Sequence, residues 1–263
     1  MFKFFLKKNF ADGWDNLFFL ILMNAFSILL VLAVWFLFPI FSKIHPALPT
    51  LSLIAFSSIL ATLIFAYGAV SAKIANFDAG EISIFFRAFL YVWKISIPFG
   101  ALLSILVLFV RFGIIYYLSL GGVIGTIAVG LLGWFMLIVS ISLQWFVPLY
   151  FLQRGNNFKK CLKKSFIIFF DNPAFSFGVF LYNIVLFAFS CALFLIAPGF
   201  AGVTLSSTNA LRLRLYKYDW LEENPELQND RDKRADVPWD ELLAEDKETL
   251  GPRKLSSFIF PWK

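Results

Sequence analysis

Residues 16–42 read NLFFLILMNAFSILLVLAVWFLFPIFS, a stretch of 27 residues without a charged side chain. A helix needs about 20 consecutive apolar residues to cross the hydrocarbon core of a bilayer, so this stretch alone predicts a membrane-spanning helix. Three further charge-free stretches follow at residues 46–72, 112–153 and 172–211. Each of the last two stretches is long enough for two membrane-spanning helices, or for parts of two. The sequence therefore predicts an all-α, polytopic membrane protein.

The composition of the whole chain agrees with this prediction. Of the 263 residues, 60% are hydrophobic and only 15% are charged, whereas soluble domains carry about 25% charged residues. The two cysteines, Cys161 and Cys191, are too few for a disulfide framework and are not spaced as metal ligands. The composition excludes a soluble enzyme, a secreted disulfide-rich domain and a disordered chain.

The charge-free stretches and the helix-breaking pair Pro198-Gly199 predict a transmembrane domain over residues 1–218. An acidic tail follows over residues 219–263. Six spans are expected, at residues 16–41, 47–72, 95–117, 121–150, 174–197 and 199–217.

Lysine and arginine residues near the ends of these spans predict the orientation. Fourteen of them lie on one side of the membrane, and only Lys43 and Arg111 lie on the other. Because cytoplasmic loops carry the excess of basic residues, an even number of spans places both termini in the cytoplasm. Residues 1–218 carry 16 basic and 5 acidic side chains, and residues 219–263 carry 7 and 12. The positive charge therefore belongs to membrane-surface loops that attract anionic headgroups, and it does not indicate nucleic acid.

Two parts of the chain share one plan, in which a polar turn and an amphipathic helix connect two spans. The turns are at residues 75–80 and 153–157, and the amphipathic helices follow at 81–94 and from residue 158. In the second helix, apolar residues recur at helical spacing on one side, which is typical of a helix lying in the headgroup plane. Both copies share one orientation, so the sequence predicts a parallel repeat. The basic side of the second helix consists of Lys159, Lys160, Lys163 and Lys164.

Several segments together resemble a known family. They are FVPLY at 146–150, FKKCLKKSF at 158–166, Asn172-Pro173, PGF at 198–200, LRLRL at 211–215 and FFRAF at 85–89. This layout, over about residues 10–217, resembles the YesL-like family of uncharacterised bacterial integral membrane proteins. The resemblance implies a bacterial inner-membrane location and a link to carbohydrate ABC transporters. It transfers no functional residues, and the acidic tail departs from the family pattern.

The spans lack the groups that most membrane chemistry uses. No Asp, Glu or His lies in any predicted span, although proton-coupled transporters usually need one as a relay. With His45 as the single histidine, neither a zinc site nor a hydrolase triad can be built. The chain also has no phosphate-binding Gly-Lys-Ser/Thr loop. We therefore expect no enzyme activity, no catalytic residues, no cofactor and no metal.

Candidate solute contacts come from the remaining polar residues of the spans. Arg111, near the outer end of the third span, either snorkels to water or contacts a solute. The sixth span is polar, and its Ser and Thr side chains either hold helices together or line a cavity. The same two interpretations apply to the amides of Asn24, Gln144 and Asn183, and a solute site requires several of them to converge. Besides Arg111, the candidate contacts are Thr204, Ser207, Thr208 and Asn209.

The tail carries a second group of candidates. Pro238 near its start and Gly251 beyond its end predict a short helix over about residues 238–248. A tail of this size cannot bury apolar side chains in a core of its own. It therefore docks either on a partner or on the chain itself, where its acids would face the basic helices. The expected docking residues are Trp239, Leu242, Leu243, Phe258, Phe260 and Trp262.

Three functions remain open from the sequence. The first is an accessory component of a carbohydrate uptake system, with ABC-transporter or other membrane subunits as partners. The second is an autonomous carrier or channel for a polar solute. The third is a structural or lipid-interacting membrane protein.

Overall fold

The computed structural model describes residues 1–227 and 237–252, and every regular element in them is helical. The elements, in chain order, are α1 (Phe2–Asp15), α2 (Leu17–Ile44), α3 (Leu48–Ala75), α4 (Ile82–Leu120), α5 (Gly122–Leu143), α6 (Phe146–Leu152), α7 (Phe158–Asp171), α8 (Pro173–Ala192), α9 (Gly199–Glu223), the 3₁₀ helix η1 (Pro225–Leu227), α10 (Trp239–Leu242) and α11 (Ala244–Leu250).

Among the described residues, five helical segments are long and apolar enough to cross a membrane. They are α2, α3, α4, the combined run of α5 and α6 (Gly122–Leu152), and α8. The predicted all-helical membrane fold is therefore confirmed. The sixth predicted span lies within α9, which joins a stretch rich in Ser and Thr to a charged C-terminal half and is not among the five.

Several helix boundaries differ from the predicted ones. The expected interfacial helix at 81–94 and the span at 95–117 form one continuous helix, α4, of 39 residues. No turn sequence separates the two parts, and the helix continues through Pro98. Conversely, the span predicted at 121–150 divides between α5 and α6. Residues 2–15 form a separate helix, α1, and α9 continues to Glu223, beyond the predicted end at 217.

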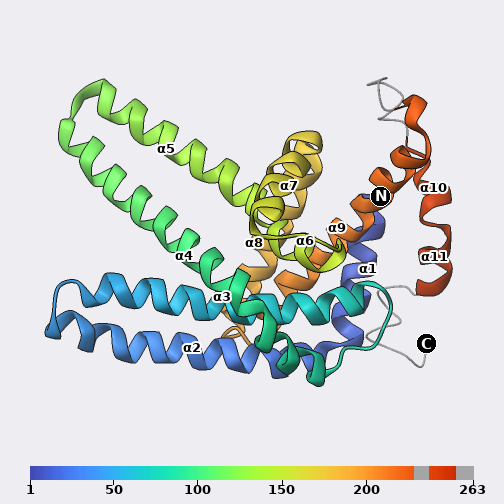
Figure 1. The fold of residues 1–263 in the computed structure, drawn as a ribbon, viewed down its shortest axis with the longest axis horizontal. Helices are drawn as coiled ribbons and strands as arrows, with labels where there is room; N and C mark the ends of the chain where they lie inside the picture. Colours follow the sequence, from blue (N-terminus) through green and yellow to red (C-terminus); the bar gives the residue numbers. More distant parts are fainter. Residues whose placement is uncertain (228–236, 253–263) are drawn as a thin grey trace.

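Helix α3 lies at the centre of the structure. It packs most extensively on α4 and also contacts α2, α6 and α9. Half of its most apolar stretch is buried, against 6% of the corresponding stretch of α4. Two hairpins, α2–α3 and α4–α5, extend to one side and diverge toward their tips, whereas α1, α10 and α11 lie at the opposite end (Figure 1). The helices of the two hairpins expose large apolar side chains, as expected of surfaces that face lipid. Among these side chains are Leu29, Trp35, Phe112, Ile124 and Trp134.

Small and hydroxyl-bearing residues bring α3 and α4 close together. Thr62 of α3 and Ser96 of α4 share a hydrogen bond of 2.8 Å, and Ser57 and Ser104 form a second one across the same interface. Between these two contacts, Gly100 faces the backbone of α3 so closely that a Cβ atom would lie 2.5 Å from the Cα of Ser58. Helices in membranes associate through such small residues because lipid supplies no hydrophobic force between helices.

Because the two backbones are so close here, we expect one added methyl group at Gly100 to lower the stability of the protein strongly. Gly100→Ala places the new Cβ against backbone atoms of α3, which cannot rotate away, so we expect a loss of about 1–3 kcal/mol of stability. Gly130→Ala in the exposed part of α5 is the matched control, since no atom lies within 4 Å of its Cβ position. Thermal unfolding of the two purified variants in the same detergent measures the difference. Equal melting temperatures for the two variants would contradict the packing described here.

Candidate functional site

Three polar side chains from different segments meet inside the helical bundle. Gln144 follows α5, Asn183 lies in the middle of α8, and Ser207 lies in the first half of α9. The Nδ2 of Asn183 donates to Ser207 Oγ at 3.0 Å and to Gln144 Oε1 at 3.4 Å. The Nε2 of Gln144 in turn donates to the carbonyl oxygen of Ser176 at 2.9 Å. We call Gln144, Asn183, Ser207 and the neighbouring Thr204 the polar cluster.

The polar cluster borders a cavity of about 220 Å³. The Oδ1 atom of Asn183 is buried and accepts no hydrogen bond from the described residues. An unsatisfied buried acceptor costs about 1–3 kcal/mol, and this one belongs to a residue that lines the cavity. The rings of Phe99, Phe180 and Phe200 form part of the wall, and every lining residue in the described part of the chain is uncharged. The described wall of the cavity is thus uncharged and mostly apolar, and its polar atoms come from the polar cluster.

A second cavity of about 390 Å³ lies between α4 and α5. It shares Phe99 and Leu143 with the first cavity, and its other walls include Leu103, Leu106 and Met136. This apolar recess between α4 and α5 therefore adjoins the cavity of the polar cluster at Phe99 and Leu143.

The five predicted solute contacts do not lie together in the structure. Thr204 and Ser207 line the polar cavity, and the hydroxyl group of each also donates to a carbonyl of its own helix. Thr208 donates to the carbonyl oxygen of Thr204 and is buried outside the cavity lining. Asn209 points to α1, where its Nδ2 donates to Asn9 Oδ1 at 3.2 Å. Arg111 is exposed on α4 and forms no ion pair or hydrogen bond within the described ranges.

The amide of Asn24 is not part of the polar cluster and instead forms hydrogen bonds to backbone atoms near the start of α9. Its Nδ2 donates to the carbonyl oxygens of Ile196 and Pro198, at 3.0 and 2.7 Å, and its Oδ1 accepts from the backbone N–H of Ala201 at 3.0 Å. The side chain thereby ties α2 to the irregular segment between α8 and α9. For Asn24 the structure supports the interpretation as a link between helices.

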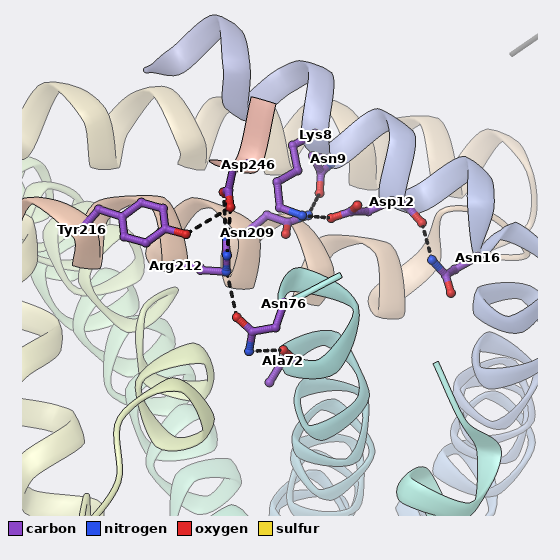
Figure 2. A network of polar contacts seen from close by, with 10 residues as sticks. All are labelled: Lys8, Asn9, Asp12, Asn16, Ala72, Asn76, Asn209, Arg212, Tyr216 and Asp246. Atoms are coloured by element: carbon purple, nitrogen blue, oxygen red, sulfur yellow. Dashed lines mark hydrogen bonds and ion pairs between the residues drawn. The ribbon is translucent and has the colours of Figure 1, made fainter. Parts of the chain in front are cut away.

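A network of polar and charged side chains joins α1, α3, α9 and α11 at the end of the molecule opposite the hairpin tips (Figure 2). We call this region the base. Lys8 is fully buried and pairs with Asp12 at 2.9 Å, and its ammonium group lies 3.5 Å from the ring centre of Phe77. Burial lowers the pKa of Lys8 and raises that of Asp12, against the attraction within the pair. Removing one partner would leave the other charge buried without compensation, which typically costs about 3–5 kcal/mol.

The same network holds the tail segment against the body. Arg212 of α9 binds Asp246 of α11 through both guanidinium Nη atoms, at 2.5 and 3.1 Å. The hydroxyl group of Tyr216 donates to the same carboxylate at 3.1 Å, and the Nε of Arg212 donates to Asn76 Oδ1 at 2.8 Å. Lys7 adds a bond from its Nζ to the carbonyl oxygen of Gly251. Residues 237–252 are thus part of the folded body and dock on the chain itself.

The predicted docking residues are distributed as follows. Leu243 is buried, and Trp239 packs on the core with its ring 5.6 Å from the guanidinium carbon of Arg214. Leu242 is half-buried. Phe258, Phe260 and Trp262 lie outside the described residues. The short helix predicted at 238–248 is two helices, α10 and α11, which divide at Leu243.

Helix α7 places its lysines as the pattern predicts, with one difference. Lys159, Lys160 and Lys163 are exposed, whereas the opposite side is buried against the body. Lys164 is half-buried instead, because its Nζ donates to Gln153 and Asn156 in the preceding turn. Three of the four lysines thus form an exposed basic surface. The buried side of α7 consists of Cys161, Ser165 and Ile168.

The base network was not predicted from the sequence. The sequence places Lys8 only among the basic residues near the first span, and it predicts that a docked tail turns its acids toward the basic amphipathic helices. In the structure Asp246 pairs instead with Arg212 of α9. One signal was available. Lys8 and Asp12 are four residues apart, a spacing that places opposite charges side by side on a helix, whereas their burial depends on packing.

No family model, curated protein or solved structure matches this chain. The geometry described above is therefore the basis for assigning a function.

The docked tail gives a direct prediction. Asp246→Asn removes the charge from a buried two-point contact, and hydrogen bonds to charged groups contribute about 1.5–3 kcal/mol. We expect hydrogen exchange of the α10–α11 amides to become at least about tenfold faster, as followed by mass spectrometry. Asp240→Asn is the matched control, because Asp240 is fully exposed and, among the described residues, pairs only with exposed Lys247. Unchanged exchange in the Asp246 variant would show that this pair does not hold the tail.

Proposed function

We propose that this chain is a membrane component of an uptake system for a small, polar, uncharged solute, with a carbohydrate as the best candidate. The observation that carries the proposal is the convergence of Gln144, Asn183 and Ser207 on one cavity with an unsatisfied amide oxygen. A solute site requires several polar side chains to meet at one cavity, whereas isolated ones serve only as links between helices.

The chemistry of the cavity supports this choice of solute. The amide and hydroxyl hydrogens of the polar cluster are already donated within the chain, so the cluster offers oxygen acceptors to the hydroxyl groups of a sugar. No lining residue in the described chain would attract an ion. At about 220 Å³, the cavity is smaller than the roughly 300–1,000 Å³ of drug-sized ligand sites. We therefore expect a solute no larger than a single sugar ring. The resemblance to the YesL-like family points in the same direction.

The proposal includes a position in the membrane. With residues 199–217 of α9 as a sixth span, both termini, α7 and the docked tail lie on one side. The excess of Lys and Arg on that side assigns it to the cytoplasm, and the family resemblance suggests the bacterial inner membrane. The exposed lysines Lys159, Lys160 and Lys163 then face anionic headgroups.

Asn183→Leu tests the solute site. The change keeps the size of the side chain and removes its polar atoms, so we expect neutral monosaccharides to bind the purified protein at least about tenfold more weakly. Equilibrium binding of a panel of radiolabelled sugars measures the effect. Thr126→Val is the control, because Thr126 is exposed on α5 and its hydroxyl bonds only its own helix. The site assignment fails if no sugar binds, or if both variants bind like the wild type.

Flux measurements separate an autonomous carrier from an accessory subunit. Uptake of the bound sugar into liposomes that contain this chain alone would identify a carrier. Binding without flux would identify a subunit that acts with partners. Selective retention of anionic lipid, with neither binding nor flux, would favour a lipid-interacting protein.

One observation favours a membrane partner. Arg111 is exposed on α4 among large apolar side chains such as Phe109 and Phe112, and it has no partner within the described chain. Charged residues in membrane segments almost always face a partner, a bundle interior or water. We propose that this surface of the α4–α5 hairpin contacts a permease subunit of the uptake system, in addition to any contact made by the tail.

Arg111→Leu tests this contact. If a partner subunit satisfies the guanidinium, the variant loses most of its copurifying partner when it is extracted gently from native membranes, as quantified by mass spectrometry. Lys43→Leu, at the tip of the other hairpin, is the charge-matched control. Equal recovery of companions with both variants, or no specific companion with the wild type, would exclude a partner at Arg111.

A further inference from the structure

A large polar pocket lies between the end of α3, the start of α4 and the loop after α6. Its volume is about 730 Å³. Three cationic side chains line it, each from a different segment: Lys73 from α3, Arg87 from α4 and Arg154 from the loop after α6. These residues belong neither to the polar cluster nor to the basic surface of α7.

The three cations are largely free to bind an anion. Arg154 makes no ion pair or hydrogen bond in the described part of the chain. Arg87 is bound only to Ser83, through its Nε to the carbonyl oxygen at 3.2 Å and through its Nη2 to the hydroxyl at 2.9 Å. These bonds hold its guanidinium back along α4 toward the start of that helix. Among the described residues, the Lys73 ammonium group has only a long contact of 3.5 Å, to Asp78, and both side chains are more than half exposed.

The position of the pocket adds a fourth attraction. Glu81 is the N-cap residue of α4, but its side chain does not cap the helix, and the first turn contains no acidic residue. The free N–H groups and the dipole at a helix start favour negative charge. The pocket thus combines two planar guanidinium groups, which match phosphate oxygens in pairs, with a helix N-terminus.

The net charge of the residues that line the pocket indicates which class of anion it binds. Three cations and the two carboxylates of Asp78 and Glu81 leave a net charge of +1. This balance suits a singly charged phosphodiester better than a doubly charged phosphate monoester. It also leaves two acceptors for an ammonium or hydroxyl group beside the phosphate.

The surroundings of the pocket point to a lipid as the source of that group. Ile84 and Phe151 contribute apolar walls. Next to the pocket, α4 exposes Leu90 and Tyr91, with 79% and 50% of their surface accessible. Tyrosine is typical of the membrane interface, and acyl chains can lie along this side of α4. We propose that the pocket binds the phosphodiester headgroup of a membrane phospholipid through Lys73, Arg87 and Arg154. This inference does not depend on the proposed solute site.

Native mass spectrometry of the full chain tests the proposal. The probe is phosphatidylglycerol, and diacylglycerol with the same acyl chains is the control that lacks phosphate. We expect the wild type to retain phosphatidylglycerol and not diacylglycerol. The variant Arg87→Gln/Arg154→Gln should retain the phospholipid about tenfold less, because it loses charged hydrogen bonds.

Two further variants guard against misleading results. Lys159→Gln/Lys163→Gln removes the same charge from the exposed basic surface of α7, where headgroups are held only by an attraction that salt screens. At physiological salt it should therefore lower retention much less than the Arg87/Arg154 variant does. Asp78→Asn/Glu81→Gln removes the opposing carboxylates and should increase retention of phosphatidylglycerol. This gain cannot come from misfolding, so the proposal stays testable if the double arginine variant is unstable.

The remaining outcomes overturn the assignment. Equal loss with the Arg87/Arg154 and Lys159/Lys163 variants would show general electrostatic attraction and no specific site. Equal retention of diacylglycerol would show that the acyl chains alone are bound. Displacement of the lipid by millimolar inorganic phosphate or glycerol 3-phosphate would assign the pocket to a soluble phosphate compound instead.

Discussion

The close contact between α3 and α4 is the constraint on which the rest of the structure depends. At Gly100 the two backbones approach so closely that no side chain fits between them, and hydroxyl pairs such as Thr62–Ser96 hold the helices on either side of this point. Because α3 also contacts α2, α6 and α9, its position relative to α4 determines how the two hairpins diverge. That divergence in turn places the recess between α4 and α5 beside the polar cluster.

Helix α9 connects the parts of the molecule to which we assign functions. Its first half contributes Thr204 and Ser207 to the cavity. Two residues after Ser207, Asn209 contacts α1, and Arg212 then holds the docked tail. Near its end, Lys217 pairs with Asp171 at 3.1 Å. A shift of α9 along its axis would therefore alter the cavity and the base together, which gives a physical route by which events at the base could reach a bound solute.

Buried charges hold the base together, and burying them costs solvation free energy. Isolated buried ions lose several kcal/mol of solvation, and an ion pair recovers this only with good geometry and further hydrogen bonds. The contact between Arg212 and Asp246 meets that condition, because Tyr216 and Asn76 supply additional hydrogen bonds. Such pairs contribute little net stability compared with apolar packing, but they penalise other arrangements of the same helices. We infer that they select one docked position for the tail.

The sequence by itself determined the class of the protein and the positions of its apolar helices, because a bilayer requires about 20 apolar residues in a row and such runs are local. It also identified Gln144, Asn183, Thr204 and Ser207 as polar residues at depth. Only the tertiary structure decided that these four converge while Thr208, Asn209 and Asn24 bind elsewhere, since convergence depends on how α5, α8 and α9 pack. The same holds for Lys8, whose burial beside Asp12 and Phe77 requires α1 to fold back on α3 and α9. Residues far apart in the chain, such as Arg212 and Asp246, meet because of packing geometry that no local pattern encodes.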